Sequence, residues 1–386
     1  MSQFSQPLQH RTGPVNLLTP SGWAIADQVV LEHGRIARIH LIDSQVDTPD
    51  SSLPYLLPGM IDSHGDAFER EISPRSGSVF PLDLALATND HLLVGAGITT
   101  FYFSITDGFE PGMRSRETVR ELMNLVEVHR DQLKCDTRIH IRHEQVNTRD
   151  HRELCDWLEA GRIDLLSLNN HLPQPDNEKK VKRFKTSISR RLKMTDTELD
   201  HFIDELQAHR DLGLEQLGEL SALARRQGIP IASHDDESME DVARAEAFGV
   251  SIAEFPLTLE VARAMGDKGI SVLVGAPNLV RGGSHVGALA AADAIQHQSA
   301  DLLCSDYHYA SLFRAPFVAA ENGLCTFPEA WNLVSAGPAK ALGIDSKTGT
   351  IEEGKDADLL LLDRLDGSPL SIKRVWVKGR PVLSVG

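Results

Sequence analysis

Between residues 56 and 346, short apolar segments alternate with longer amphipathic ones, and this alternation limits the possible folds more than any other feature. Connectors of helix length, such as 115–133 and 213–227, separate most of the short segments. Eight strand and helix pairs in about 290 residues predict a (β/α)8 barrel, also called a TIM barrel. The alternative is a doubly wound sheet, but the first predicted strand lacks the glycine-rich phosphate fingerprint common in that fold. The eight predicted strands end near His64, Ser104, Asn147, His171, His234, Pro256, Asn278 and His308.

The two ends of the chain have a different pattern from the middle. Short strand-like pieces separated by turn signals occur near both termini. They cover 14–18, 22–26, 28–32 and 35–42 at one end and 358–363, 373–378 and 380–383 at the other. We therefore expect an α/β protein in which residues 1–55 and 347–386 form one small β-sandwich domain, while residues 56–346 form the barrel.

Composition excludes several classes of protein. A net charge of −16 argues against broad binding to nucleic acid or to an anionic membrane. Neither the apolar core of a signal peptide nor an apolar run of membrane-spanning length is found, so we expect a cytoplasmic protein. The four cysteines are scattered without a CxxC pair, which argues against a disulfide framework and a thiolate zinc site. The 16 histidines and 55 carboxylates could instead supply metal ligands.

Imidazole and carboxylate side chains stand where the predicted strands end. His64 and Asp66 are two residues apart and therefore leave the same face of a strand. A single histidine there is more often structural, and a single aspartate such as Asp235 or Asp236 is usually a helix cap. Six such residues on five strands predict a metal-containing active site that suits Zn, Mn, Ni or Fe. They are His64, Asp66, Glu144, His171, His234 and Asp306.

The connector 176–196 is basic, with eight lysines and arginines against three acidic residues. It can be a solvated helix face, or a lid that meets an anionic substrate.

Segments along nearly the whole chain resemble the amidohydrolase superfamily, whose members are metal-dependent hydrolases with a barrel and a small β-sandwich. The segment LPGMIDSH at 57–64 and the segment 349–363 are similar to the two boundaries of that barrel. Other motifs resemble the superfamily branch that acts as diphosphatases in phosphonate metabolism. They are HGDAFER at 64–70, HIRHE at 140–144, SLNNH at 167–171, ASHDD at 232–236 and GAPNLVRGGSH at 275–285.

The resemblance implies a binuclear centre of two divalent ions, with zinc expected and Mn, Ni or Fe as alternatives. His64, Asp66 and Asp306 would hold one ion, His171 and His234 the other, and Glu144 would bridge them. Asp306 would also be the catalytic acid and base, taking the proton from the attacking water. The superfamily commonly has His-x-His on the first strand and often a carboxylated lysine as the bridge. This chain has Asp66 and Glu144 instead.

The resemblance also implies a substrate, alpha-D-ribose 1-methylphosphonate 5-triphosphate, hydrolysed to the 5-phosphate and diphosphate. Residues suited to bind phosphate are Arg75, Arg142, Arg281, Gly282, Gly283, Ser284 and His285. Gly282 and Gly283 can equally form a simple turn, and Arg142 can pair with a nearby acid. A second hypothesis is cleavage of C–N bonds by a deacetylase or cyclic amidase with the same metal centre, and a third is a non-catalytic scaffold. We expect a homodimer that binds a small phosphorylated sugar.

Overall fold

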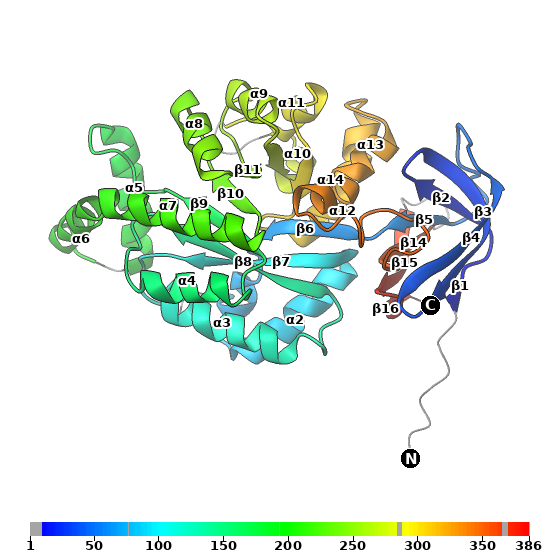
Figure 1. Cartoon of the computed structure of the whole chain (residues 1–386), viewed down its shortest axis with the longest axis horizontal. Coiled ribbons are helices and arrows are strands. Elements are labelled where there is room, and N and C mark those ends of the chain that lie inside the picture. Colours follow the sequence, from blue (N-terminus) through cyan, green and yellow to red (C-terminus); the bar gives the residue numbers. More distant parts are fainter. Residues whose placement is uncertain (1–9, 76, 193, 284–287, 365–369, 386) are drawn as a thin grey trace, which may run out of the picture. The chain divides into compact units, whose positions relative to one another are not determined.

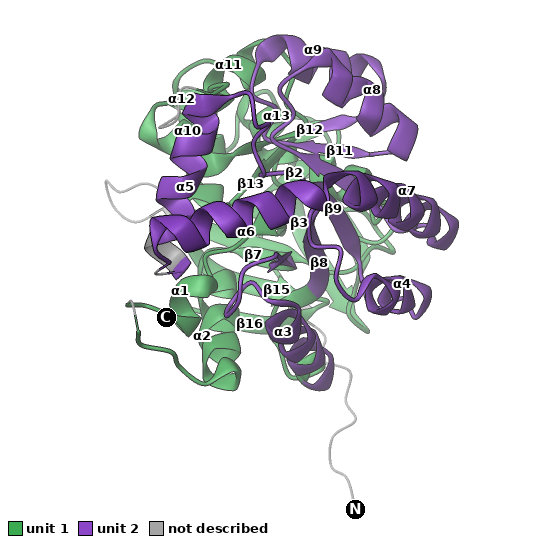
Figure 2. Cartoon of the chain, turned by 90° about the vertical axis from the view of Figure 1, so that its left-hand side faces the viewer, with its two compact units in different colours: residues 1–101, 129–137, 273–386 green, residues 102–128, 138–272 purple. Residues whose placement is uncertain are grey.

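The structure is a computed structural model, and it describes all residues except 1–9, 76, 193, 284–287, 365–369 and 386 (Figure 1). The chain divides into two compact units (Figure 2). Unit 1 comprises residues 1–101, 129–137 and 273–386, and unit 2 comprises residues 102–128 and 138–272. The domain boundaries near residues 55 and 347 stay a prediction.

The eight barrel strands are present and lie in sequence order in one parallel sheet, which confirms the predicted fold class. Within unit 1, a parallel bridge between Gly65 and Asp306 joins the first strand to the residues after the last. All ten residues of the second strand are buried, as expected for a parallel sheet covered by helices. The strands are β6 (Met60–Gly65), β7 (Ile98–Asp107), β8 (Asp136–Glu144), β9 (Leu165–Asn169), β10 (Ile231–His234), β11 (Ile252–Glu254), β12 (Ser271–Gly275) and β13 (Leu302–Cys304).

Helices follow the strands, and several begin at side-chain caps that the sequence supplies. Thr195 and Ser238 each form a capping box with the residue three positions later. The helices of the first half are α1 (Glu69–Ile72), α2 (Leu82–Gly95), α3 (Arg116–His129), α4 (His151–Glu159), α5 (Glu178–Leu192), α6 (Asp196–Ala208) and α7 (Arg210–Gln227). Those of the second half are α8 (Met239–Phe248), α9 (Leu259–Asp267), α10 (Ala276–Arg281), α11 (Ala291–Gln296), α12 (Tyr309–Glu321), α13 (Phe327–Asn332) and α14 (Ala336–Ala341).

Some boundaries differ from the prediction. Asn278 lies inside α10 and not at a strand end, because Pro277 near the helix start favours helical backbone. Asn147 and His308 lie three and four residues beyond the ends of their strands. The long connector after β9 folds into three helices, α5 to α7. Within the described residues, no helix combines the length and apolar character needed to cross a membrane.

Both termini contribute to a second sheet, as predicted. Its central contact is the antiparallel pairing of β5 with β14, in which Leu57 faces Leu360. Leu17, Leu56, Leu359 and Trp376 from the two ends of the chain share its buried core. The predicted pieces 22–26 and 28–32 form one continuous strand, β3. The strands are β1 (His10–Arg11), β2 (Val15–Thr19), β3 (Gly22–Glu32), β4 (Arg35–Asp43), β5 (Tyr55–Pro58), β14 (Leu359–Arg364), β15 (Leu370–Val377) and β16 (Arg380–Ser384).

Candidate metal centre

Three of the predicted ligands lie together in unit 2, at the carboxyl ends of neighbouring strands. Glu144 ends β8, His171 follows β9 and His234 ends β10. The carboxylate of Glu144 contacts Nδ1 of His171 and also accepts a hydrogen bond from the His171 backbone amide at 3.3 Å. The rings of His171 and His234 meet edge to face with centroids 5.1 Å apart. Parallel strands in register bring these positions to one edge of the sheet.

Asp235 belongs to the same group, although the sequence analysis interpreted it as a helix cap. Its Oδ2 lies 3.4 Å from Nδ1 of His234 and 3.7 Å from Nε2 of His171. The ligand atoms of the three residues lie within 4.8 Å of one another. The cap interpretation is wrong because Ser238 caps α8. The sequence does not distinguish the two aspartates after His234, because only the backbone conformation brings Asp235 next to the histidines.

The charges of the acidic side chains in this group favour binding of a cation. Burial would raise the pKa of Glu144, but the charge and hydrogen bonds of His171 outweigh it and lower the pKa to about 2. The charge of Glu144 in turn raises the pKa of His171 to about 10, against the effect of burial and with help from Asp235. Burial opposes ionisation of Asp235 as well, yet His234 and His171 hold its pKa below the usual range. Two carboxylates with lowered pKa values therefore flank His171, and such negative charge favours a bound cation.

Two further residues border His234. Nη2 of Arg142 lies 3.3 Å from Nε2 of His234, so this guanidinium reaches a candidate ligand. The ring of Phe255 packs edge to face against His234, with centroids 5.3 Å apart. Phe255 has a φ of 59°, which is uncommon for a bulky residue, and Asp235 has a φ of 57°. Such backbone is concentrated at functional sites because the surrounding structure must hold it.

The other three predicted ligands, His64, Asp66 and Asp306, lie together in unit 1. The Asp306 amide donates to the His64 carbonyl, and the Asp66 amide donates to the Asp306 carbonyl, both at 3.0 Å. Asp306 also has a left-handed backbone, with a φ of 51°. Behind them, Asp62 accepts hydrogen bonds from Ser305, and burial raises the pKa of Asp62 to about 6. Each predicted set of ligands therefore lies within one unit, while the bridging role of Glu144 stays a prediction.

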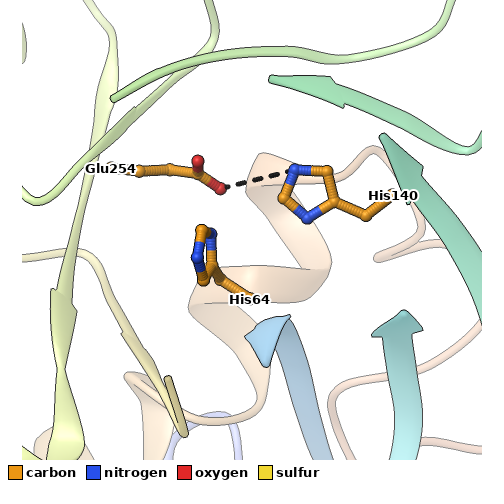
Figure 3. A group of neighbouring side chains, drawn as sticks. All are labelled: His64, His140 and Glu254. Carbon is orange, nitrogen blue, oxygen red and sulfur yellow. Dashed lines mark ion pairs between the residues drawn. The ribbon is translucent and has the colours of Figure 1, made fainter. Parts of the chain in front are cut away.

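Two further potential ligands in unit 2, His140 and Glu254, were not predicted from the sequence (Figure 3). His140 Nε2 and Glu254 Oε1 lie 3.8 Å apart, and both side chains are fully buried. Ser104 contacts Nδ1 of His140 at 2.9 Å, and Ser167 donates to Glu254 at 2.7 Å. The alternation that aims Glu144 out of β8 also selects His140, four residues earlier on the same face. That alternation was the available signal.

Comparison with known proteins now identifies the fold family. The sequence profile described as "Amidohydrolase family" matches residues 55–382. The chain belongs to this family. A relative from Escherichia coli (strain K12), alpha-D-ribose 1-methylphosphonate 5-triphosphate diphosphatase, is 32% identical over 365 residues, which are 93% of this chain and 96% of the relative.

Solved structures that superpose on this chain support its fold. Their sequence identity is too low to support more than the fold. The N-acetylglucosamine-6-phosphate deacetylase from Pasteurella multocida superposes with a TM-score of 0.64 at 14% identity, covering 97% of this chain and 99% of the deacetylase. Molinate hydrolase superposes with a TM-score of 0.61 at 13% identity, covering 98% and 95% of the two chains.

The predicted phosphate-binding residues of this amidohydrolase are only partly grouped. Arg281, at the end of α10, donates from Nη1 to the Tyr307 hydroxyl at 3.1 Å, which places it beside the neighbour of Asp306. Gly282 and Gly283 follow with φ of 81° and 146°, backbone that favours glycine. Arg75 lies in an exposed turn and pairs through its backbone with Ser78. Ser284 and His285 lie outside the described residues.

The basic connector forms most of α5. Lys180 on this helix pairs with Glu237, two residues after Asp235, and Lys185 pairs with Asp200 of α6. The helix therefore reaches the loop that follows β10. Its function as a substrate lid stays a prediction.

Proposed function

We propose that this amidohydrolase is a metal-dependent diphosphatase of phosphonate metabolism. Its substrate would be alpha-D-ribose 1-methylphosphonate 5-triphosphate, cleaved by water at the anhydride bond between the α- and β-phosphates to give the 5-phosphate and diphosphate. The observation that supports this is the 32% identity to a diphosphatase acting on that compound, across 93% of one chain and 96% of the other.

The donor set suits a divalent metal. Imidazole nitrogens and carboxylate oxygens without a thiolate are ligands for Zn, Mn, Ni or Fe. In unit 2 such atoms come within 4.8 Å of one another in His171, His234 and Asp235. The ligand assignment that the family resemblance implies is His171 and His234 for one ion and His64, Asp66 and Asp306 for another, with Glu144 as the bridge. Bound divalent ions would polarise the phosphoryl oxygen and acidify water.

The remaining roles belong to side chains of the chain itself. Asp306 would take the proton of the attacking water and return it to the leaving diphosphate. Arg281, beside Tyr307, would bind the phosphates through its guanidinium, and Arg70 lies over the same tyrosine ring at 5.9 Å. Arg142, Arg75 and residues 282–285 would complete the anion site. Local cations of this kind are needed in a protein with a net charge of −16.

The test is to supply purified protein with divalent metal and the ribose triphosphate, and to measure diphosphate and orthophosphate separately. We expect equimolar diphosphate. Release of orthophosphate alone, or hydrolysis of an N-acetylated sugar phosphate in place of the triphosphate, would refute the assignment, and the latter would favour C–N bond cleavage.

Arg281→Ala tests recognition of the triphosphate. Loss of one charged hydrogen bond, worth about 1.5–3 kcal/mol, predicts a rise in KM of roughly 10- to 150-fold. Arg314→Ala is the matched control, because Arg314 is partly exposed on α12, where it pairs with Glu321 and lies over the Phe317 ring.

A further inference from the structure

We propose that Asp235 is itself a metal ligand together with His171 and His234, and that Glu144 is a positioning residue behind His171. This inference rests on the metal dependence in the proposed function. It differs from the assignment above by giving the third position to Asp235 and removing Glu144 from direct contact with the ion.

The contacts of His171 determine which nitrogen can bind a metal. One oxygen of Glu144 contacts Nδ1 and the other accepts from the backbone amide of the same histidine. Glu144 therefore holds the ring of His171 through one oxygen and its backbone through the other, and leaves Nε2 facing Asp235. A carboxylate that holds the far nitrogen of a ligating histidine is a recurrent outer-shell arrangement in metal sites.

The distances from Asp235 to the two histidines fit coordination of one shared ion better than they fit hydrogen bonds. Two ligand atoms bound at about 2.1 Å to one tetrahedral ion lie about 3.4 Å apart. Oδ2 of Asp235 is 3.4 Å from Nδ1 of His234 and 3.7 Å from Nε2 of His171. Both distances exceed the usual hydrogen-bond length of about 2.9 Å. One oxygen and two ring nitrogens, all within 4.8 Å of one another, thus border a position that a metal ion can occupy.

Backbone and exposure support the same role. The left-handed φ of 57° at Asp235 and the hydrogen bond of its amide to the Glu254 carbonyl, at 2.9 Å, fix the carboxylate next to the histidines. Side-chain exposure is 42% for Asp235 and 38% for His171. The group is therefore closed by protein on one side and open on the other. Three protein ligands with an open position are typical of catalytic metal sites.

The experiment measures binding of Zn²⁺ to the metal-free full-length protein, by calorimetric titration and by metal analysis after dialysis. Asp235→Asn should lower the affinity more than 100-fold and remove one zinc per chain. Glu144→Gln should lower the affinity only about 10- to 100-fold, because the amide oxygen can still accept from His171, and it should keep the stoichiometry at saturation. Glu237→Gln, two residues away and paired with Lys180, is the control for lost charge and should bind as the wild type does.

The visible absorption spectrum of bound Co²⁺ is a second readout, which does not depend on affinity. This spectrum should differ from that of the wild type in Asp235→Asn and should be unchanged in Glu144→Gln. Asp235→Gly repeats the test with a residue that adopts a φ of 57° at no cost, should the asparagine variant fold poorly. Wild-type zinc binding by either Asp235 variant would overturn the proposal, as would loss of the ion in Glu144→Gln alone or a wild-type protein that binds no zinc. If these variants behave as expected but no diphosphate is released, the ligand set stands and the proposed substrate is wrong.

Discussion

Gly213, in α7, lies directly against the turn that follows Glu144. A Cβ atom added to Gly213 would lie 1.9 Å from the backbone oxygen of Gln145, whereas contacts under 3.0 Å essentially do not occur. The side chain of Gln145 also donates to the Arg210 carbonyl at 3.0 Å, so the turn and the helix are joined here. Gly213→Ala therefore forces the helix and the turn apart by about 1 Å.

Two opposing contributions decide whether Gly213→Ala raises or lowers the stability of the protein. Alanine is favoured over glycine inside a helix by about 1 kcal/mol. Overpacking of a closed interface costs about 1–3 kcal/mol, and an overlap with backbone, which cannot rotate away, belongs at the upper end. We expect Gly213→Ala to lose about 2 kcal/mol. Gly218 is in the same helix, and its added Cβ would meet only the Phe248 ring at 3.8 Å. Gly218→Ala should therefore gain up to about 1 kcal/mol.

Urea denaturation followed by circular dichroism compares the two variants, and the difference in their unfolding free energies should be about 3 kcal/mol. Zinc affinity should fall in Gly213→Ala as well, because Glu144 is next to the displaced turn. Equal or greater stability of Gly213→Ala relative to the wild type would refute the packing argument.

Other predictions concern buried charges and the metal. Burial raises the pKa of Asp358 to about 6, despite hydrogen bonds from Thr348 and Lys378. Because the folded state holds this proton more tightly, the free energy of unfolding falls as the pH rises from about 4 to 6. Above pH 6, the free energy of unfolding of Asp358→Asn should exceed that of the wild type by about 3 kcal/mol. Urea denaturation at several pH values measures this difference. Asp107 accepts from Arg116 and contacts His143, so Asp107→Asn should cost about 3–5 kcal/mol in the same assay; a loss below about 1 kcal/mol would contradict an ionic role. Zinc at 100 times its Kd should stabilise the wild type by about 2.7 kcal/mol in thermal unfolding, an effect that a chelator reverses.

The barrel could be predicted from sequence because eight apolar segments separated by helix-length connectors leave few other folds. The end of the helix predicted near 213–227 also followed from a local signal, since Gly228 ends α7 in the left-handed conformation, whereas its start lies earlier, at Arg210. Asn278 was misplaced because α10 follows β12 directly, so that strand and helix form one apolar run in the sequence, and Gly275 is both the last residue of the strand and the N-cap of the helix.

The site was predictable in part for a related reason. Residues at strand ends such as His171 and His234 could be named because parallel strands bring their ends to one edge. The contribution of Asp235 could not, because it depends on a left-handed φ that an aspartate does not reveal in sequence. His140 was missed because it lies inside β8, where a polar residue is identified as a ligand only once its partner, here Glu254 at the end of β11, is known.

The pairing of β5 with β14 has a consequence for synthesis of the chain on the ribosome. The apolar strands β2, β3 and β5 are made first, but their partner is separated from them by about 300 residues. At about 5–20 residues per second, these strands wait roughly 15–60 s before β14 is translated. Leu17, Leu56 and Leu57, which are fully buried in the finished protein, lack that cover for the whole interval. The sheet formed by both termini is therefore completed only late in translation or after the chain is released, and the nascent protein needs protection from aggregation until then.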